Sequence, residues 1–245
     1  MQKLQTSIFR LLFWLPLALL GSITVHAEDN DKELTAFLNE FKKCNFMFES
    51  QLKRDQEKAV QTLNAAINIL GSPKQEHSDL QEKWFRSYSV ATSSEIKTTF
   101  ELAKSNLLRM NWLCGRPGLA NIGHGNLRYF GDSVLASVYN ADPTRTVYIL
   151  PRYFDDKSYR GDSAGWDGSH VLIHEALHFR YPGAGLVDVA IKVPIGDSIE
   201  ERIAYSKEDS TNVANIDSYA AKKNVNNYIF FLVDLNSLNA ELNSK

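Results

Sequence analysis

Apolar residues recur at intervals of three and four along the first half of the chain. They do so from Leu34 to Phe48, from Val60 to Leu70, and from Ile96 to Met110, after Ser93-Ser94-Glu95. This spacing puts the apolar side chains on one face of a helix, and Gly71-Ser72-Pro73 is typical of a helix end. The pattern therefore predicts three helices, each with an apolar stripe facing the core.

Short β-prone runs begin the second half of the chain. Ser133 to Tyr139 and Thr146 to Leu150 flank the turn-forming sequence Asn140-Ala141-Asp142-Pro143, and together they predict a β-hairpin. A loop rich in Gly and Asp, residues 155–168, then leads to an apolar segment. We expect this segment to form a helix that begins near Ser169 and ends by Pro182-Gly183.

Further helix is expected near the C-terminus, within Ser198 to Tyr205 and within Ser218 to Leu238. The apolar run Tyr228 to Val233 is too short to cross a membrane, so we expect it in the core. Helices in residues 28–114, followed by a hairpin and more helices in residues 115–245, predict an α+β fold. No repeat and no linker rich in Gly, Ser or Pro divides residues 28–245, which predicts a single domain.

The first 27 residues have the features of a secretory signal peptide. Lys3 and Arg10 precede the apolar stretch Leu11 to Val25, and Val25-His26-Ala27 supplies small residues for cleavage after Ala27. We expect residues 1–27 to be removed, which predicts a secreted or periplasmic protein with no membrane segment in its mature form. Nothing in the sequence indicates its oligomeric state, and a monomer is assumed.

Composition narrows the choice of partners. Without Lys3 and Arg10, the 27 basic residues become 25 against 29 acidic residues, a net charge near −4, and no basic run is present. The chain therefore lacks the electrostatic pattern of nucleic-acid binding. Its two cysteines, Cys44 and Cys114, are an even number in an exported protein, which favours a disulfide over two free thiols.

The sequence His174-Glu175-Ala176-Leu177-His178 contains candidate metal-binding and catalytic residues. Two histidines four apart on a helix share one face and can bind one metal ion, while the glutamate between them can take a proton from a metal-bound water. Core packing alone explains three polar groups on one short apolar helix poorly, because buried His and Glu need partners. The hypothesis that follows is a zinc hydrolase, with a peptidase as its first candidate.

A third metal ligand has to come from elsewhere, because catalytic zinc usually has three protein ligands and one open position. No histidine follows His178, so Asp188, Asp197, Glu200 and Glu201 are the candidates, and spacing alone does not choose among them. Glu201 fits a Glu-x-x-Ala sequence on an expected helix, whereas Asp197 has the setting of a helix cap. His170, four residues before the first histidine, is expected to be a hydrogen-bonding residue of the first helical turn.

Several blocks resemble the deuterolysin-like aspzincin metalloendopeptidases, and they occur in the order found in that family. The similarity spans most of residues 28–245. The blocks are Val147 to Phe154, the His-Glu-Ala-Leu-His-Phe segment, Gly185-Leu186-Val187-Asp188 and Asn215-Ile216-Asp217-Ser218-Tyr219. The resemblance implies a zincin-like fold with a small sheet beside the metal helix. It also implies one zinc ion per chain bound by His174, His178 and Asp188, Glu175 as general base, and a protein or peptide substrate.

The chain departs from the family pattern at two positions of the third-ligand block. Leu186 replaces a Thr, and Ile191 replaces a Tyr whose hydroxyl is thought to stabilise the oxyanion. Tyr181, Tyr205 or Tyr219 would have to supply a substitute hydroxyl. Alternative functions are therefore a zinc-binding module without turnover and a secreted effector protease of narrow specificity.

A third departure concerns cleavage preference. Some fungal members of the family cleave before lysine, using acidic residues in the block that matches residues 215–220. This chain keeps Asp217 but has Ala220 at the second acidic position. A preference for lysine is therefore not expected.

Overall fold

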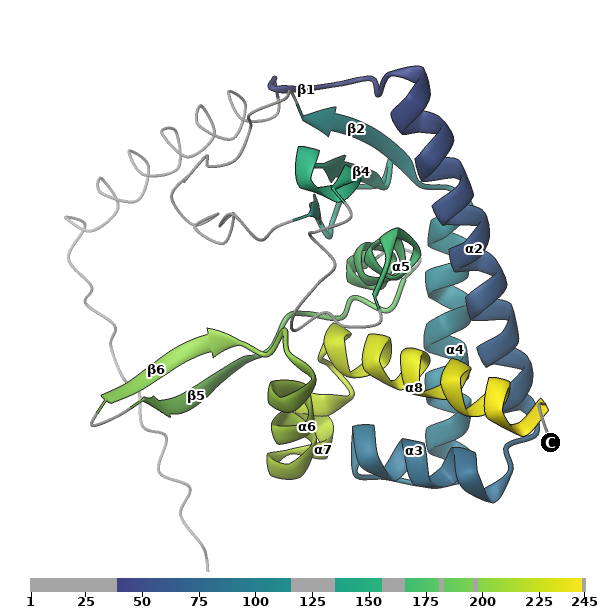
Figure 1. Ribbon diagram of the computed structural model, residues 1–245. Coiled ribbons are helices and arrows are strands. Elements are labelled where there is room, and N and C mark those ends of the chain that lie inside the picture. Colours follow the sequence, from purple (N-terminus) through teal and green to yellow (C-terminus); the bar gives the residue numbers. More distant parts are fainter. Residues whose placement is uncertain (1–38, 116–134, 156–165, 181–182, 196–197, 244–245) are drawn as a thin grey trace, which may run out of the picture.

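The computed structural model describes residues 39–115, 135–155, 166–180, 183–195 and 198–243 (Figure 1). The expected signal peptide, residues 1–27, lies outside these residues, and so do Tyr181 and Asp197.

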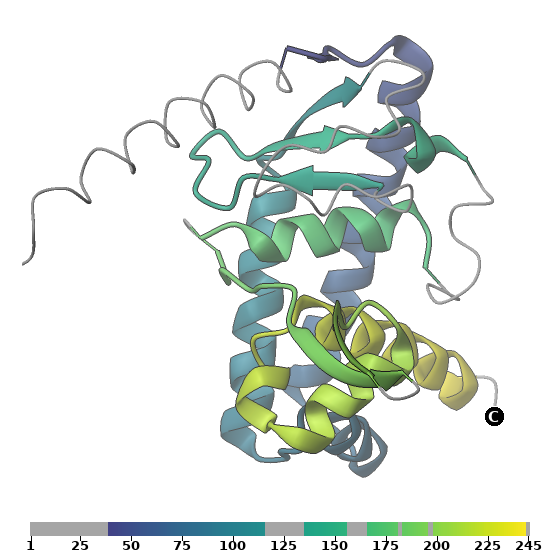
Figure 2. The same cartoon turned by 90° about the vertical axis from the view of Figure 1, so that its left-hand side faces the viewer.

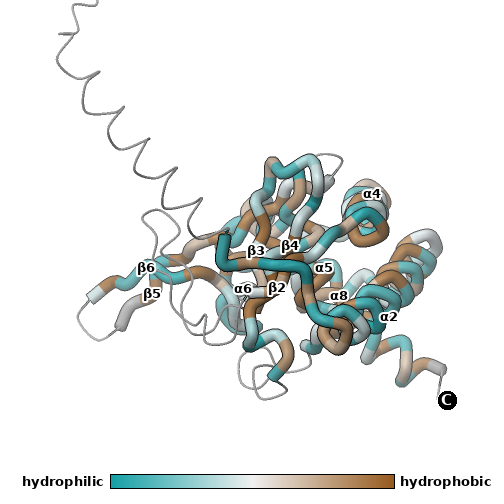
Figure 3. Tube along the Cα trace, turned by 90° about the horizontal axis from the view of Figure 1, so that it is seen from above, coloured by the Kyte–Doolittle hydropathy of each residue, from teal (hydrophilic) through white to brown (hydrophobic). Residues whose placement is uncertain are grey.

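Helix α2 (Phe46–Gly71) is a single long helix. Asn45 begins it by accepting a hydrogen bond from the Phe48 amide, and its buried residues follow the spacing of one helical face, seen as alternating colours in Figure 3. The prediction that the first helix runs from Leu34 through Phe41 and Cys44 is wrong for the described residues. Phe41 lies in strand β1 (Phe41–Lys42), and Cys44 precedes the cap because it forms a disulfide with the sheet.

Helix α4 (Val90–Leu107) begins earlier than the Ser93-Ser94-Glu95 sequence predicted. Ser89 is its N-cap, because the Ser89 hydroxyl accepts a hydrogen bond from the Thr92 amide. Ser93 instead lies buried inside the helix and donates to the side-chain oxygen of Gln81. Gln81 belongs to α3 (Gln75–Phe85), a helix that the apolar pattern did not predict.

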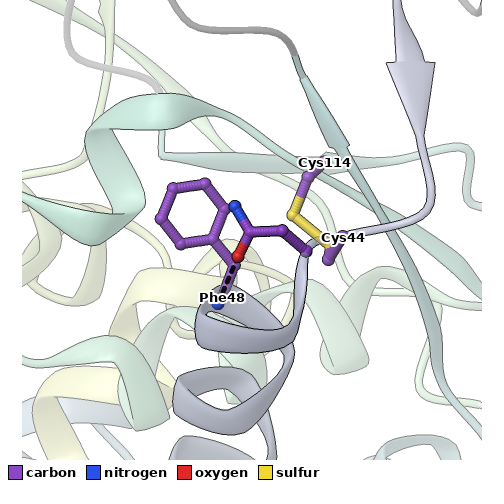
Figure 4. The surroundings of a disulfide bond; sticks show 4 residues. Cys44, Phe48 and Cys114 are labelled. Atoms are coloured by element: carbon purple, nitrogen blue, oxygen red, sulfur yellow. Dashed lines mark hydrogen bonds between the residues drawn. A yellow bond between two sulfur atoms is a disulfide. The ribbon is translucent and has the colours of Figure 1, made fainter.

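The main sheet has the strand order β1-β2-β4-β3. Strand β2 (Asn111–Gly115) runs parallel to β4 (Thr146–Ile149), whereas β3 (Ala136–Val138) is antiparallel to β4, which confirms the predicted hairpin. A short 3-10 helix, η3 (Pro151–Phe154), follows β4. The Cys44–Cys114 disulfide joins the residue before the α2 cap to β2 (Figure 4), as expected from the even number of cysteines.

A second, two-stranded sheet replaces the helix predicted for residues 198–205. Strands β5 (Ala190–Ile195) and β6 (Ser198–Ile203) pair antiparallel and extend away from the helices (Figures 1 and 3). Glu and Arg favour helix weakly, but the β-branched residues of β5 provide a neighbouring strand, and pairing overrides local propensity. Most side chains of β6 are exposed.

The remaining helices are α5 (Gly168–His178), α6 (Lys207–Ile216), α7 (Ser218–Ala221) and α8 (Val225–Asn243). Helix α5 contacts α2, α4, α8 and β3, so one hydrophobic cluster contains residues from both halves of the chain. The run from Tyr228 to Leu232 is buried in this cluster, as predicted. Of the helices in the described residues, none combines the length and apolarity of a membrane span. The observed class is α+β, as predicted.

Candidate metal centre

The helix that carries the two histidines is fixed at its N-terminus by Asp167. The Asp167 carboxylate accepts hydrogen bonds from the Ser169 and His170 amides, and it lies 3.0 Å from Nδ1 of the His170 ring. Hydrogen bonds from His170, Lys58 and Ser169 outweigh burial and lower the pKa of Asp167 well below its usual range. His170 therefore serves the first helical turn, as predicted, and its expected role as a hydrogen-bonding residue is observed.

Gly168 lets the start of α5 pack tightly against α2 and η3. A β-carbon at this position would lie 2.4 Å from the Asp55 carboxylate and 2.6 Å from the Tyr153 hydroxyl. The same hydroxyl donates to Asp55 and contacts the Gly168 carbonyl oxygen. These contacts fix both the position and the rotation of α5, and so the direction in which its histidines point.

His174 and His178 lie one turn apart on α5 and face the same point. Their Nε2 atoms are 3.1 Å apart, and both side chains are largely buried. The Nδ1 atom of His178 lies 2.9 Å from the Leu186 carbonyl oxygen, which accepts a hydrogen bond when that nitrogen is protonated. In that tautomer the lone pair of Nε2 is free for a metal ion.

Asp188 comes to the same point from the segment between α5 and β5. One of its carboxylate oxygens lies 3.5 Å from Nε2 of His174, and the other lies 3.5 Å from Nε2 of His178. Together the three residues form the one group of potential metal ligands within the described ranges, with ligand atoms no more than 4.8 Å apart. In a tetrahedral zinc site with bonds of about 2.0–2.1 Å, two ligand atoms lie about 3.3–3.4 Å apart. The separations of 3.1 Å between the two Nε2 atoms and 3.5 Å from each Nε2 atom to Asp188 are close to this value, the latter two through different carboxylate oxygens.

The segment that carries Asp188 is held by the start of α8. The Val187 amide donates to the Lys223 carbonyl, and the Val225 amide donates to the Val187 carbonyl, each at 3.0 Å. The Val189 amide donates to the side chain of Asn224. Sequence reasoning missed this contact, although three asparagines in an apolar setting, Asn224, Asn226 and Asn227, are a pattern that needs buried partners.

The three candidate ligands have strongly displaced pKa values. Burial lowers the pKa of His174 to about 4. Burial also opposes protonation of His178, but its hydrogen bond to Asp188 and the nearby Glu175 raise the His178 pKa to about 9. The two imidazoles outweigh burial at Asp188 and lower its pKa to about 2. Without a metal ion, one proton is therefore shared between His178 and Asp188 at neutral pH.

Glu175 is buried beside this group. Burial, with a smaller contribution from the charge of Asp188, raises the pKa of Glu175 to about 7, although His178 opposes the shift. A carboxyl group that titrates near neutrality suits a general base, because it can both accept and return a proton at working pH.

Of the candidate tyrosines within the described residues, Tyr205, just after the β5–β6 hairpin, reaches the metal ligands. Its hydroxyl donates to Asp188 at 3.2 Å, and its ring centroid lies 6.5 Å from that of His174. Ile191, at the position of the family tyrosine, packs instead against the small apolar cluster of Ala204, Val213, Ala214 and Ala221. The tyrosine hydroxyl observed beside the ligands therefore belongs to Tyr205, which follows β6, and not to position 191 in β5.

The other described residues that the sequence suggested for the site do not belong to the three-ligand group. Glu200 and Glu201 are exposed on β6, so neither joins the group, and the expected helix that would have presented Glu201 is absent. Asp217 is the N-cap of α7, where its side chain accepts a hydrogen bond from the Tyr219 amide. Tyr219 is exposed, with the Lys223 ammonium over its ring.

Comparison with known proteins concerns the fold. No protein-family model matches the chain, and no curated protein matches its sequence. Among solved structures, a zinc peptidase from Grifola frondosa is similar, with a TM-score of 0.56 and 19% sequence identity over 78% of this chain and 97% of that chain. The expected resemblance to zinc peptidases is confirmed at the level of the fold: this chain has the α+β fold of a zinc peptidase.

Proposed function

We propose that this chain is an exported zinc-dependent endopeptidase of the aspzincin family. The observation that carries the proposal is the convergence of His174, His178 and Asp188, whose Nε2 and carboxylate oxygen atoms have the mutual separations of zinc ligands. The fold shared with a zinc peptidase supports it. The disulfide supports export, because disulfides persist in oxidising compartments.

The chemistry follows from the groups around the ligands. A zinc ion bound there would polarise a peptide carbonyl and acidify a bound water. Glu175, buried beside the ligands, takes the proton of the attacking water and then delivers it to the amine of the leaving peptide. A hydrogen bond to Asp188 places the Tyr205 hydroxyl beside the ligands. In the reaction this single O–H would turn from Asp188 to the oxyanion that forms at the carbonyl.

The experiment that tests the function compares Glu175→Gln with His174→Ala. We expect the Gln variant to keep stoichiometric zinc and to lose nearly all hydrolysis of an unfolded protein such as casein, because the amide cannot accept a proton. The Ala variant should lose both zinc and activity. A Gln variant that cleaves casein at the parent rate would show that Glu175 is not the base.

The second candidate is a zinc-binding module without turnover. Ile191 favours this second candidate. The aspzincins that the chain resembles have an oxyanion-stabilising tyrosine at this position, whereas the Ile191 side chain packs against an apolar cluster. Zinc content and a digest of an unfolded protein mixture separate the alternatives. Zinc without cleavage supports the binding module, and cleavage of one protein among many supports an effector protease of narrow specificity.

A further inference from the structure

Asn226, near the start of α8, contacts one of the candidate ligands. Its side chain is fully buried, and its amide nitrogen donates to Oδ1 of Asp188 at 3.2 Å. That same carboxylate oxygen lies 3.5 Å from Nε2 of His174. Asn226 therefore contacts the third ligand at the oxygen that faces the first histidine.

The other end of the Asn226 amide has an unused acceptor. Among the described residues, neither Oδ1 of Asn226 nor Nδ1 of His174 has a hydrogen-bond partner, although both atoms are buried. Leaving two buried polar atoms unpaired costs about 1–3 kcal/mol each. The two atoms are complementary when His174 carries its proton on Nδ1, and both belong to side chains that lie against Oδ1 of Asp188.

A matching arrangement already exists at His178. There the Leu186 carbonyl faces Nδ1 and leaves Nε2 for the metal. Histidines that bind metals almost always donate their second ring N–H to a carboxylate, carbonyl or similar group, and this contact fixes the ring and its tautomer. The amide oxygen of Asn226 is the corresponding acceptor for His174.

The backbone beside Asn226 also holds the segment of the third ligand. The Val225 amide donates to the Val187 carbonyl, so one turn of α8 anchors both the backbone next to Asp188 and the Asp188 carboxylate. We propose that Asn226 is a positioning residue of the metal centre, which holds His174 in its Nδ1–H tautomer and orients Asp188 toward both imidazoles. The inference rests on the proposed zinc site and does not depend on turnover.

Zinc affinity of the folded protein tests the proposal. Chelator-stripped parent, Asn226→Leu and Gln81→Leu are titrated with zinc in competition with a chromophoric chelator, after circular dichroism has shown that each is folded. Removing a contact of this kind typically weakens metal binding about 10–100-fold, which is the loss expected for Asn226→Leu.

Gln81→Leu is the matched control. Gln81 is also a fully buried amide, but it lies in α3, where its side-chain oxygen accepts from Ser93 of α4. Its replacement should leave zinc affinity within about threefold of the parent, well short of the loss expected when a contact to a ligand is removed. Equal zinc affinity of Asn226→Leu and the parent would overturn the inference. So would an equal loss of affinity in both variants.

A measurement on the parent protein applies even where the Leu variants do not fold. In the zinc-loaded parent labelled with nitrogen-15 histidine, we expect a slowly exchanging proton on Nδ1 of His174 and a zinc-shifted Nε2. A proton on Nε2, or zinc on Nδ1, overturns the inference. Failure of the parent to bind zinc would overturn the proposed function together with this inference, whereas zinc binding without proteolysis would overturn the proposed peptidase activity alone.

Discussion

At the scale of single residues, a proton and a metal ion compete for the same place between His178 and Asp188. The His178 pKa is raised to about 9 and that of Asp188 is lowered to about 2, so the metal-free pair keeps one proton throughout the neutral range. Zinc must displace this proton, since the Nε2 lone pair cannot serve both.

Zinc affinity should therefore rise with pH, by about tenfold per unit up to about pH 9, and then level off as His178 loses its proton in the metal-free protein as well. Competition titrations between pH 6.5 and 9.5, corrected for protonation of the chelator, measure this slope. An affinity that stays constant from pH 6.5 to 8.5 would contradict the assignment of the shared proton.

Tyr205→Phe tests the origin of the oxyanion hydroxyl. Because the Tyr205 hydroxyl donates to Asp188 at the metal centre, we expect its removal to lower kcat about 100-fold with little change in KM, as found when an oxyanion donor is lost. Tyr219→Phe is the control, since Tyr219 is exposed beside Lys223, and it should keep parent kinetics. A Tyr205→Phe variant with parent kcat and weakened zinc binding would assign the hydroxyl to ligand orientation instead.

The residues that the sequence identified and those it missed differ in how far their contacts reach along the chain. His174, Glu175 and His178 share one helical turn, so their spacing alone predicts that they converge. Asp188 could be selected only through a resemblance, because its position depends on pairing with residues near Asn224. The contact of Asn226 with Asp188 spans 38 residues, and no local pattern encodes it.

At the scale of elements, the stability of α5 depends on the cap at Asp167. We expect Asp167→Ala to lower the free energy of unfolding by about 1–2 kcal/mol at pH 7, the usual cost of losing a helix cap. The Asp167 pKa is lowered in the folded protein, so this stabilisation is present above the unfolded pKa and is lost as pH falls below it toward the folded value. The difference between variant and parent should accordingly shrink below about pH 4.

Urea denaturation at pH 7 and pH 3 measures this difference. Asp217→Ala is the control, because Asp217 caps the four-residue helix α7, whose loss exposes little core. A destabilisation by Asp167→Ala that is equally large at pH 3 would contradict the charge-dependent part of the argument.

The elements that were predicted correctly are those whose own sequence determines their structure. The apolar stripe of α2 and the turn between β3 and β4 are local patterns, and the structure has both. Residues 198–205 form a strand because β5 pairs with them, and the isolated segment, with Glu200, Glu201 and Arg202, gives no indication of that partner. Likewise, Phe41 and Cys44 continue a helical spacing but belong to the sheet and its disulfide.

At the scale of the whole molecule, the metal centre lies where the two halves of the chain meet. Helix α5, from the second half, packs against α2 and α4 from the first half, and α8 covers it from another side. Figure 2 shows α5 below the sheet and in front of the two long helices. Single-domain organisation remains a prediction, which the shared hydrophobic cluster supports.

The Cys44–Cys114 disulfide should stabilise this assembly without changing its metal centre. It closes a sequence separation of 70 residues, for which loop entropy predicts about 4 kcal/mol. The bridge joins the residue before the α2 cap to β2, which pairs with β1 and β4, and neither cysteine belongs to the group of candidate metal ligands.

We therefore expect the double variant Cys44→Ala/Cys114→Ala to unfold at clearly lower urea concentration, while its folded fraction binds zinc with parent affinity. Parallel urea titrations of zinc-loaded parent and variant, with the reduced parent as a second reference, measure the first effect, and competition with a chelator measures the second. A variant that keeps parent stability would mean that the reduced, unfolded chain is already constrained near these residues. A variant that is folded but has lost zinc affinity would mean that the bridge holds α2 and β2 in the position on which the orientation of α5 depends.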